Sequence, residues 1–126
     1  MYPLLFIHPD QKLVKIYETH LNRHFAFESA HDGLSALRKI RLAAPHVIVS
    51  DFHLPILSGL ALLKFVRGTP SLAATPFIFL AGQGDMGQGL EFGANDWLNQ
   101  AEATPGLLLD KIAGHLKLNI RLLNLR

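Results

Sequence analysis

Asp51 is the residue of this sequence whose position most favours chemistry. It follows the apolar run VIVS and opens the stretch DFHLPILSG, in which Pro55 stands four residues and Gly59 eight residues after it. An aspartate that ends a buried strand lies where ligands reach the edge of a parallel sheet, so its carboxylate could be the centre of a site. An aspartate in such a place also often forms a turn. Its role therefore depends on the residues that the fold places around it.

Two histidines extend this candidate site. His8 ends the first apolar run, and His53 stands two residues after Asp51. Imidazole and carboxylate groups are zinc ligands, so these three residues are one hypothesis for a transition-metal site. Whether His53 also faces Asp51 depends on the turn that follows the strand. Because the chain has seven histidines, chance proximity is expected, and we predict a site without metal.

The elements that must position these residues alternate along the chain. Segments with helical apolar spacing separate short apolar runs, and Asp10 and Ser58 are placed to cap two of those helices. Runs too apolar for half-exposed strands predict an α/β fold, with a parallel sheet covered by helices on both faces. We expect five strands in the doubly wound, flavodoxin-like order 2-1-3-4-5, at residues 3–8, 25–30, 46–52, 76–81 and 95–99. In that order His8 and Asp51 should be neighbours.

The composition predicts one cytoplasmic domain over residues 1–126. Hydrophobic residues make up 49% of the chain, charged residues 17%, and cysteine is absent, which fits a reducing compartment. The apolar runs are too short for a membrane span, and the start of the chain lacks the features of a signal peptide. The net charge is only +2, and the densest basic group, Arg38, Lys39 and Arg41, fits a solvated helix face. We therefore expect no binding to membranes or nucleic acids.

Several motifs in the right order resemble the receiver domain of two-component response regulators, over roughly residues 3–118. In that family the phosphate-accepting aspartate is followed by proline four residues on and glycine eight on, and Asp51, Pro55 and Gly59 fit this spacing. HDGLSAL resembles the opening of the family's second helix. TPFIFLAG and EFGANDWLNQ resemble its fourth strand and the entry to its fifth strand.

The resemblance also shows which functional positions differ in this chain. It assigns Asp51 to the phosphoryl acceptor, whereas the family's acidic pair, which helps to hold Mg²⁺, aligns with His8 and Pro9. The family's Thr or Ser aligns with Ala81, and its Lys aligns with Gln100. Mg²⁺ takes oxygen ligands, and phosphoryl transfer needs its charge neutralised. Only the acceptor is kept, so the resemblance implies a degenerate receiver, or pseudo-receiver.

We therefore predict a signalling domain that is not an enzyme, has no Mg²⁺ or other cofactor and acts by protein–protein interaction. The alternative is a phosphorylation-switched receiver of a phosphorelay, with Asp51 as its acceptor. Asp10 lies close to the site but is expected to cap the first helix. His8 is expected to replace the missing cations by pairing with Asp51 as an imidazolium, unless it is only a strand-end residue that points into a loop.

The segment before the fifth strand belongs to the signalling face of that family. Here it reads GQGDMGQGLEF, and each glycine inside a helix costs roughly 1 kcal/mol relative to alanine. We therefore expect less than two turns of helix over residues 83–92. Trp97 stands at the family's aromatic position and is either a fixed side chain or an exposed contact residue of this face.

The C-terminal stretch LLLDKIAGHLKLNIRLLNLR keeps apolar residues at helical spacing up to its end. It predicts either an ordinary final helix or, over residues 119–126, a helical extension toward a following domain or a dimer partner. The expected partners are accordingly another protein or a covalently linked output domain, with a homodimer as a further option.

Overall fold

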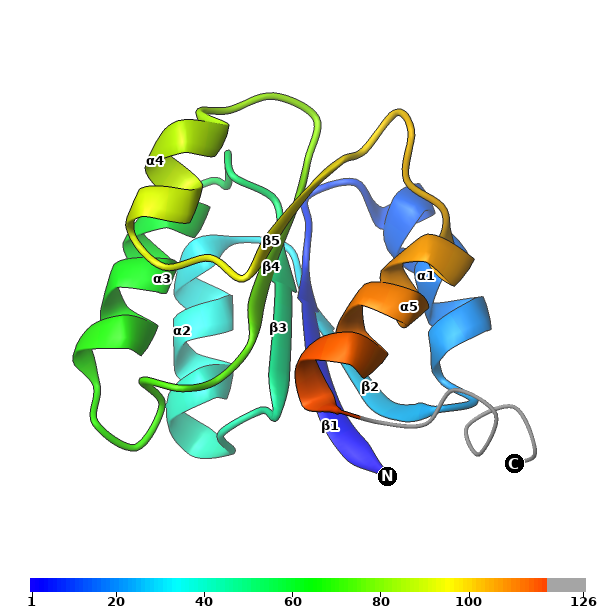
Figure 1. Ribbon diagram of the computed structural model, residues 1–126, viewed down its shortest axis with the longest axis horizontal. Coiled ribbons are helices and arrows are strands. Elements are labelled where there is room, and N and C mark those ends of the chain that lie inside the picture. The colour runs from blue at the N-terminus through cyan, green and yellow to red at the C-terminus, as the bar shows by residue number, and fades with distance from the viewer. Residues whose placement is uncertain (118–126) are drawn as a thin grey trace.

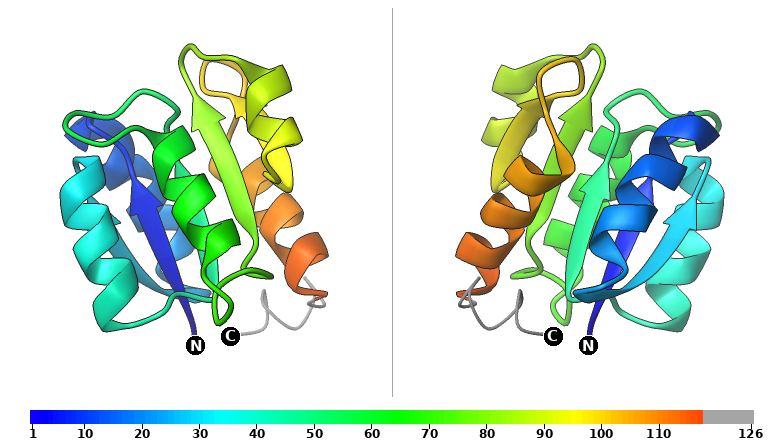
Figure 2. Two further views of the ribbon diagram at one scale, coloured as in Figure 1. Left: turned by 90° about the vertical axis from the view of Figure 1, so that its left-hand side faces the viewer. Right: turned by 90° about the vertical axis from the view of Figure 1, so that its right-hand side faces the viewer.

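A parallel sheet forms the centre of the computed structural model, which describes residues 1–117 (Figure 1). The strands lie side by side in the order β2 (Phe25–Ala30), β1 (Tyr2–Ile7), β3 (Val47–Ser50), β4 (Phe77–Ala81) and β5 (Asp96–Asn99). This order confirms the predicted doubly wound sheet. The strands run in the same direction, so their carboxyl ends meet at one end of the molecule (Figure 2). The helical extension predicted over 119–126 lies outside the described residues.

Helices cover both faces of the sheet, as predicted. One face carries α1 (Gln11–Leu21) and α5 (Pro105–Leu116), and the other carries α2 (Gly33–Leu42), α3 (Gly59–Gly68) and α4 (Met86–Glu91) (Figure 1). Each helix follows a residue whose side chain accepts a hydrogen bond from the first turn, namely Asp10, Asp32, Ser58, Asp85 and Thr104. Within residues 1–117, none of these helices has the length and hydropathy that crossing a bilayer requires.

The central strands explain why this sheet needs two helical layers. Every residue of β3 and of β4 is buried, so each strand has an apolar side chain on both faces. Two separate apolar clusters result, one beneath α2 and α3 and one beneath α1 and α5. A strand of this kind can be buried only when helices lie on both sides of the sheet.

Some apolar residues with helical spacing are not buried against the sheet. In α1 the buried side chains are Val14, Tyr17 and Leu21, whereas Ile16 is exposed. In α2 Leu34 is exposed at the start of the helix. A helix on a flat sheet can bury only the side chains that point at the sheet, so apolar residues beside that stripe remain in solvent.

The predicted shortness of α4 is confirmed. This helix has six residues, which is less than two turns, and its sequence MGQGLE contains two glycines. The helix lies beside β5.

Candidate functional site

His8 and Asp51 meet at the carboxyl end of the sheet. Ile7 pairs with Ser50 at the ends of β1 and β3, so the next residue of each strand reaches the same point. The distance from His8 Nε2 to Asp51 Oδ2 is 3.4 Å, and only 3% of His8 and 8% of Asp51 are exposed. The predicted proximity of the two residues is therefore confirmed.

The Asp51 carboxylate is held by its own loop. Its Oδ1 accepts a hydrogen bond of 2.7 Å from the backbone N–H of Phe52, and its backbone N–H donates to the Ile7 carbonyl. Ser50 Oγ donates to the Asp51 carbonyl at 2.8 Å. The carboxylate thus has backbone and imidazole donors around it and no lysine or arginine in an ion pair within the described residues.

The shortest side-chain bond of His8 is made to Gln100. Its Nε2 lies 2.7 Å from Gln100 Oε1, and its Nδ1 accepts a hydrogen bond of 3.1 Å from the backbone N–H of Asp10. Because Nδ1 accepts, the ring hydrogen lies on Nε2, where it is donated to Gln100 and faces Asp51. This pattern fits a neutral imidazole. The expectation that His8 supplies a positive charge does not fit it, because an imidazolium has no lone pair for the Asp10 N–H.

The remaining positions predicted from the sequence lie around this pair. Gln100 follows β5, and its backbone N–H donates to the Ala81 carbonyl at the end of β4. Ala81 is buried and has no hydroxyl group, and Pro9 is exposed. The Asp10 carboxylate accepts from the backbone N–H groups of the first turn of α1, at 3.0 and 3.3 Å, which confirms its predicted role as a cap.

These residues do not fit Mg²⁺. The ion requires several oxygen ligands at near-octahedral positions. Next to Asp51 the structure places the imidazole of His8, and the one further carboxylate at this loop, that of Asp10, already accepts two N–H groups of α1.

The three-residue metal hypothesis is wrong for the described part of the chain. Residues 1–117 contain no cluster of three or more histidine or carboxylate side chains able to hold a metal ion. His53 is exposed, and its ring meets the Phe52 ring edge-on at a centroid distance of 5.2 Å. The turn after β3 therefore directs His53 against its neighbour and not toward His8.

Trp97 belongs to an aromatic cluster on the α4 side of the sheet. Its ring lies 5.4 Å from that of Phe52 and 5.2 Å from that of Phe79, and the Phe52 and Phe79 rings are 5.4 Å apart. Trp97 is half-buried in this cluster, so of the two predicted roles the structure favours the fixed side chain. The sequence did not predict that Phe52 belongs to this cluster. The only indication in the sequence was that Phe52 is apolar and directly follows Asp51.

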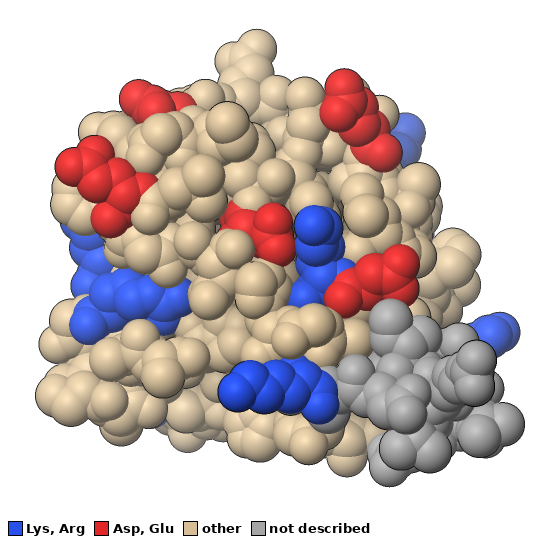
Figure 3. All heavy atoms as spheres, in the orientation of Figure 1, with Lys and Arg blue, Asp and Glu red and all other residues tan. Residues whose placement is uncertain are grey.

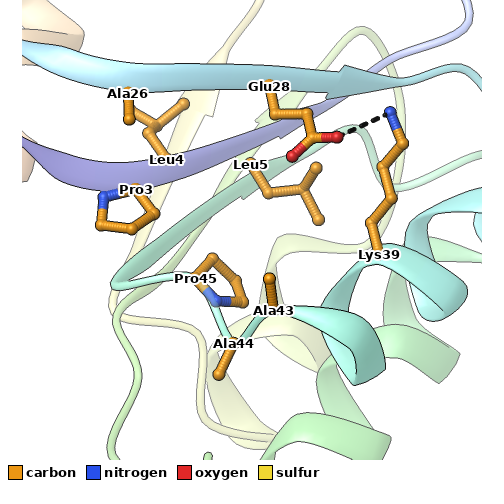
Figure 4. A pocket seen from close by; sticks show the side chains of 9 residues that line it. All are labelled: Pro3, Leu4, Leu5, Ala26, Glu28, Lys39, Ala43, Ala44 and Pro45. Carbon is orange, nitrogen blue, oxygen red and sulfur yellow. Dashed lines mark ion pairs between the residues drawn. The ribbon is translucent and has the colours of Figure 1, made fainter.

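A separate hollow of about 80 Å³ lies away from this site, between β1, β2 and the C-terminal end of α2 (Figure 4). Lys39 and Glu28 form an ion pair of 3.3 Å at its side. Its other lining residues are apolar, mostly alanine, leucine and proline. This hollow offers no nucleophile and no group of ligands, so Asp51 and its neighbours remain the candidate site.

Comparisons with known proteins agree with the fold. The profile of the response regulator receiver domain matches residues 4–112. The protein-glutamate methylesterase/protein-glutamine glutaminase of Desulfotalea psychrophila is 34% identical, over 77% of this chain and 28% of its own length. The probable chemotaxis protein CheY of Rhizobium etli is 33% identical, over 56% of this chain and 57% of its own. The chain thus matches less than two thirds of either relative's length.

A solved structure shows the same architecture. The crystal structure of a putative response regulator from Chloroflexus aurantiacus has a TM-score of 0.84 and 29% sequence identity. The matched region covers 92% of this chain and 98% of that one.

Proposed function

This chain belongs to the response regulator receiver family, and we propose that it is an atypical member that acts without Mg²⁺-dependent phosphorylation of Asp51. Receiver domains are signalling modules of two-component systems. The proposed domain keeps their fold and transmits its signal through contacts with other proteins. It is not proposed to be an enzyme.

The observation that carries this proposal is the hydrogen-bonded group around Asp51. The imidazole of His8 lies 3.4 Å from the carboxylate and is itself bonded to Gln100. Both side chains stand at positions where the family has a metal ligand and a lysine. An imidazole that is bonded to an amide therefore lies beside the carboxylate, and Asp51 is buried.

Electrostatics supports the same conclusion. A transferring phosphoryl group carries negative charge on three oxygens, and catalysis consists mainly of positioning it and neutralising that charge. Removing one preorganised charge-stabilising group from an active site typically costs about 3 kcal/mol of transition-state stabilisation. This chain has Gln100 in place of the lysine, Ala81 in place of the hydroxyl residue and no acidic pair after β1.

The proposed partners are proteins. One matched relative, which is named for a methylesterase activity, shares only 28% of its length with this chain, and this supports a protein partner or a covalently linked output domain here as well. A homodimer is a further option. On the face in Figure 3, the basic and acidic side chains of described residues are interspersed, which gives no support for nucleic-acid binding. The lack of cysteine fits our placement in the cytoplasm.

A phosphodonor assay tests the proposal. The purified chain is incubated with acetyl phosphate and Mg²⁺, and its intact mass is measured. We expect no gain of a phosphoryl group, because the site lacks the ligands and the cation that the transfer requires. A mass gain that Asp51→Asn abolishes would support the alternative, a phosphorylation-switched receiver.

A restored variant sharpens the assay. The combined substitution His8→Asp, Pro9→Asp, Ala81→Thr and Gln100→Lys returns the family's residue types to the same fold. We expect this variant to gain one phosphoryl group under the conditions in which the natural chain gains none. A receiver of known activity in the same solution confirms that the donor is competent.

A further inference from the structure

The segment from Gly82 to Phe92 packs on the molecule with almost no side-chain burial. Gly89 is its only buried residue. The large apolar side chains of this segment remain in solvent, with exposed fractions of 52% for Met86, 45% for Leu90 and 40% for Phe92. The other four helices within residues 1–117 each bury at least two apolar side chains.

Two glycines take the place of those missing side chains. A Cβ added to Gly89 would lie 3.1 Å from the rings of Phe79 and Trp97. A Cβ added to Gly84 would lie 2.7 Å from the Phe52 ring and 2.8 Å from the Trp97 ring. The backbone of this segment therefore rests directly on the aromatic cluster of Phe52, Phe79 and Trp97.

The anchors of the segment lie at its C-terminal end. Lys64 of α3 lies over the Phe92 ring at 4.3 Å, and Arg67 Nε donates to the Gly93 carbonyl at 2.9 Å. Further toward the N-terminus, the Asp85 carboxylate accepts from the Gln88 N–H of the same helix. For residues 82–91, no described side-chain hydrogen bond or ion pair reaches another element.

The backbone conformation supplies bending points at both ends. Gly84 has φ +145° and Gly93 has φ +106°, which are values that residues with a side chain rarely adopt. They stand on either side of α4. Glycine within the helix also makes it less stable than alanine would, so local unfolding of α4 should cost little free energy.

We propose that α4, with the preceding residues 82–85, is a detachable cover over the aromatic cluster of Phe52, Phe79 and Trp97. It opens by local unfolding, pivots at Gly84 and Gly93 and remains attached through Phe92 and Gly93. Opening exposes aromatic ring faces next to the candidate site, because Phe52 directly follows Asp51. The proposal rests on packing alone and holds whether or not Asp51 accepts a phosphoryl group.

Two alanine substitutions of the full chain test it. Gly89→Ala puts a methyl group against the rings, whereas Gly87→Ala adds the same methyl group where the nearest neighbour is the Asp85 side chain, 3.3 Å away. Both gain helix propensity. We expect amide exchange over residues 82–91 to become at least about fivefold faster in Gly89→Ala, because a methyl group forced against the rings destabilises the packing of α4. In Gly87→Ala it should become about fivefold slower, because alanine stabilises the helix.

Trp97 gives an independent readout, because it is the single tryptophan of the chain. Acrylamide quenching of its fluorescence should rise in Gly89→Ala and stay at the wild-type level or below it in Gly87→Ala. Exchange in α3 should be the same in all three proteins. If both variants slow exchange over 82–91 equally, or if Gly89→Ala speeds exchange in α3 as much as in α4, α4 is not a separate cover. In the unmodified chain, exchange over 82–91 as slow as that of α3 would also overturn the proposal.

Discussion

The helices α3 and α4 lie on the same face of the sheet but are held there in different ways (Figure 1). The inner face of α3 carries Leu62, Leu63 and Val66, all fully buried, and its last turn carries Arg67. The inner face of α4 carries Gly89. One helix is held by apolar side chains in the core, and the other by backbone that lies on aromatic rings.

The position of a helix in the fold therefore does not determine how firmly it is held. Fully burying an aliphatic side chain contributes about 1.5–3 kcal/mol, so α3 has several such contributions and α4 has none. The region that is weakly held adjoins the candidate site through Trp97 and Phe52. Elements that move in signalling are drawn from the less stable parts of a protein, and α4 meets that condition.

Matched leucine truncations should show the largest difference. Leu63→Ala in α3 is expected to lower the free energy of unfolding by about 2–5 kcal/mol, because it leaves a cavity in the core. Leu90→Ala in α4 should change it by less than about 0.5 kcal/mol, because Leu90 is exposed and does not belong to the buried core. Urea unfolding followed by circular dichroism measures both values. Equal losses in the two variants would mean that α4 is as integral to the core as α3.

Arg67 joins the two regions and should show an intermediate effect. Its guanidinium donates to the carbonyls of Gly93, Ala73 and Thr75 and to the Asn95 side chain. Arg67→Ala removes a donor from each of these acceptors, and only the Asn95 side chain keeps another one, the Phe77 N–H. We therefore expect a loss of about 1–3 kcal/mol in the free energy of unfolding. Arg67→Lys keeps the charge but not the forked donor geometry, and should recover only part of the loss.

The loss of unfolding free energy in Arg67→Ala should not depend on pH. Burial lowers the pKa of Arg67 from its ordinary value. That ordinary value is so high that the guanidinium remains charged wherever the protein is folded. Denaturant midpoints of Arg67→Ala and wild type at several pH values check this. A lysine variant as stable as wild type would show that charge alone, and not the set of four acceptors, holds this junction.

The helix caps on this face should show the smallest effect, and the only one with a pH dependence. Backbone and side-chain hydrogen bonds from Ser35 lower the pKa of Asp32, the cap of α2. Because this pKa is lower in the folded state, the Asp32 carboxylate adds to the free energy of unfolding. Its full contribution is present at pH values above the ordinary pKa of about 4 and is lost as the pH falls through the folded-state pKa. Asp32→Ala should therefore be less stable than wild type at neutral pH and approach it in acid.

The cap of α4 provides the control. Asp85 accepts a hydrogen bond from its helix as Asp32 does, but α4 carries no buried side chain. Asp85→Ala should speed amide exchange in α4 and leave global unfolding unchanged. If Asp85→Ala lowered the free energy of global unfolding as much as Asp32→Ala does, α4 would not differ from the helices that are packed by side chains.

Much of the fold was predictable because the signals are local. Apolar runs predicted the strands, and the order of strands followed from their parallel, doubly covered character. The glycines predicted a short α4 for the same reason, since each acts on its own turn of helix. The exposure of Ile16 and Leu34 was not predictable, because helical spacing does not say how wide a face the sheet can bury.

The candidate site was predictable in its positions but not in its bonds. The sequence placed His8 beside Asp51 and marked Gln100 as the replaced lysine. It did not indicate that His8 bonds to Gln100, residues that stand 92 positions apart in the chain. Nor did it indicate that the backbone N–H of Asp10 occupies Nδ1 of His8, which is what favours the neutral ring over the expected cation.

By itself, then, the sequence determined the alternation of strands and helices, the place of Asp51 at a strand end and the weakness of α4. These depend on residue type and on spacing along the chain. Only the tertiary structure decided which partner each nitrogen of His8 has, and that Gly84 and Gly89 rest on Phe52, Phe79 and Trp97. Such contacts join separate strands and loops, and their distances follow from how the strands are ordered and how the helices pack on them.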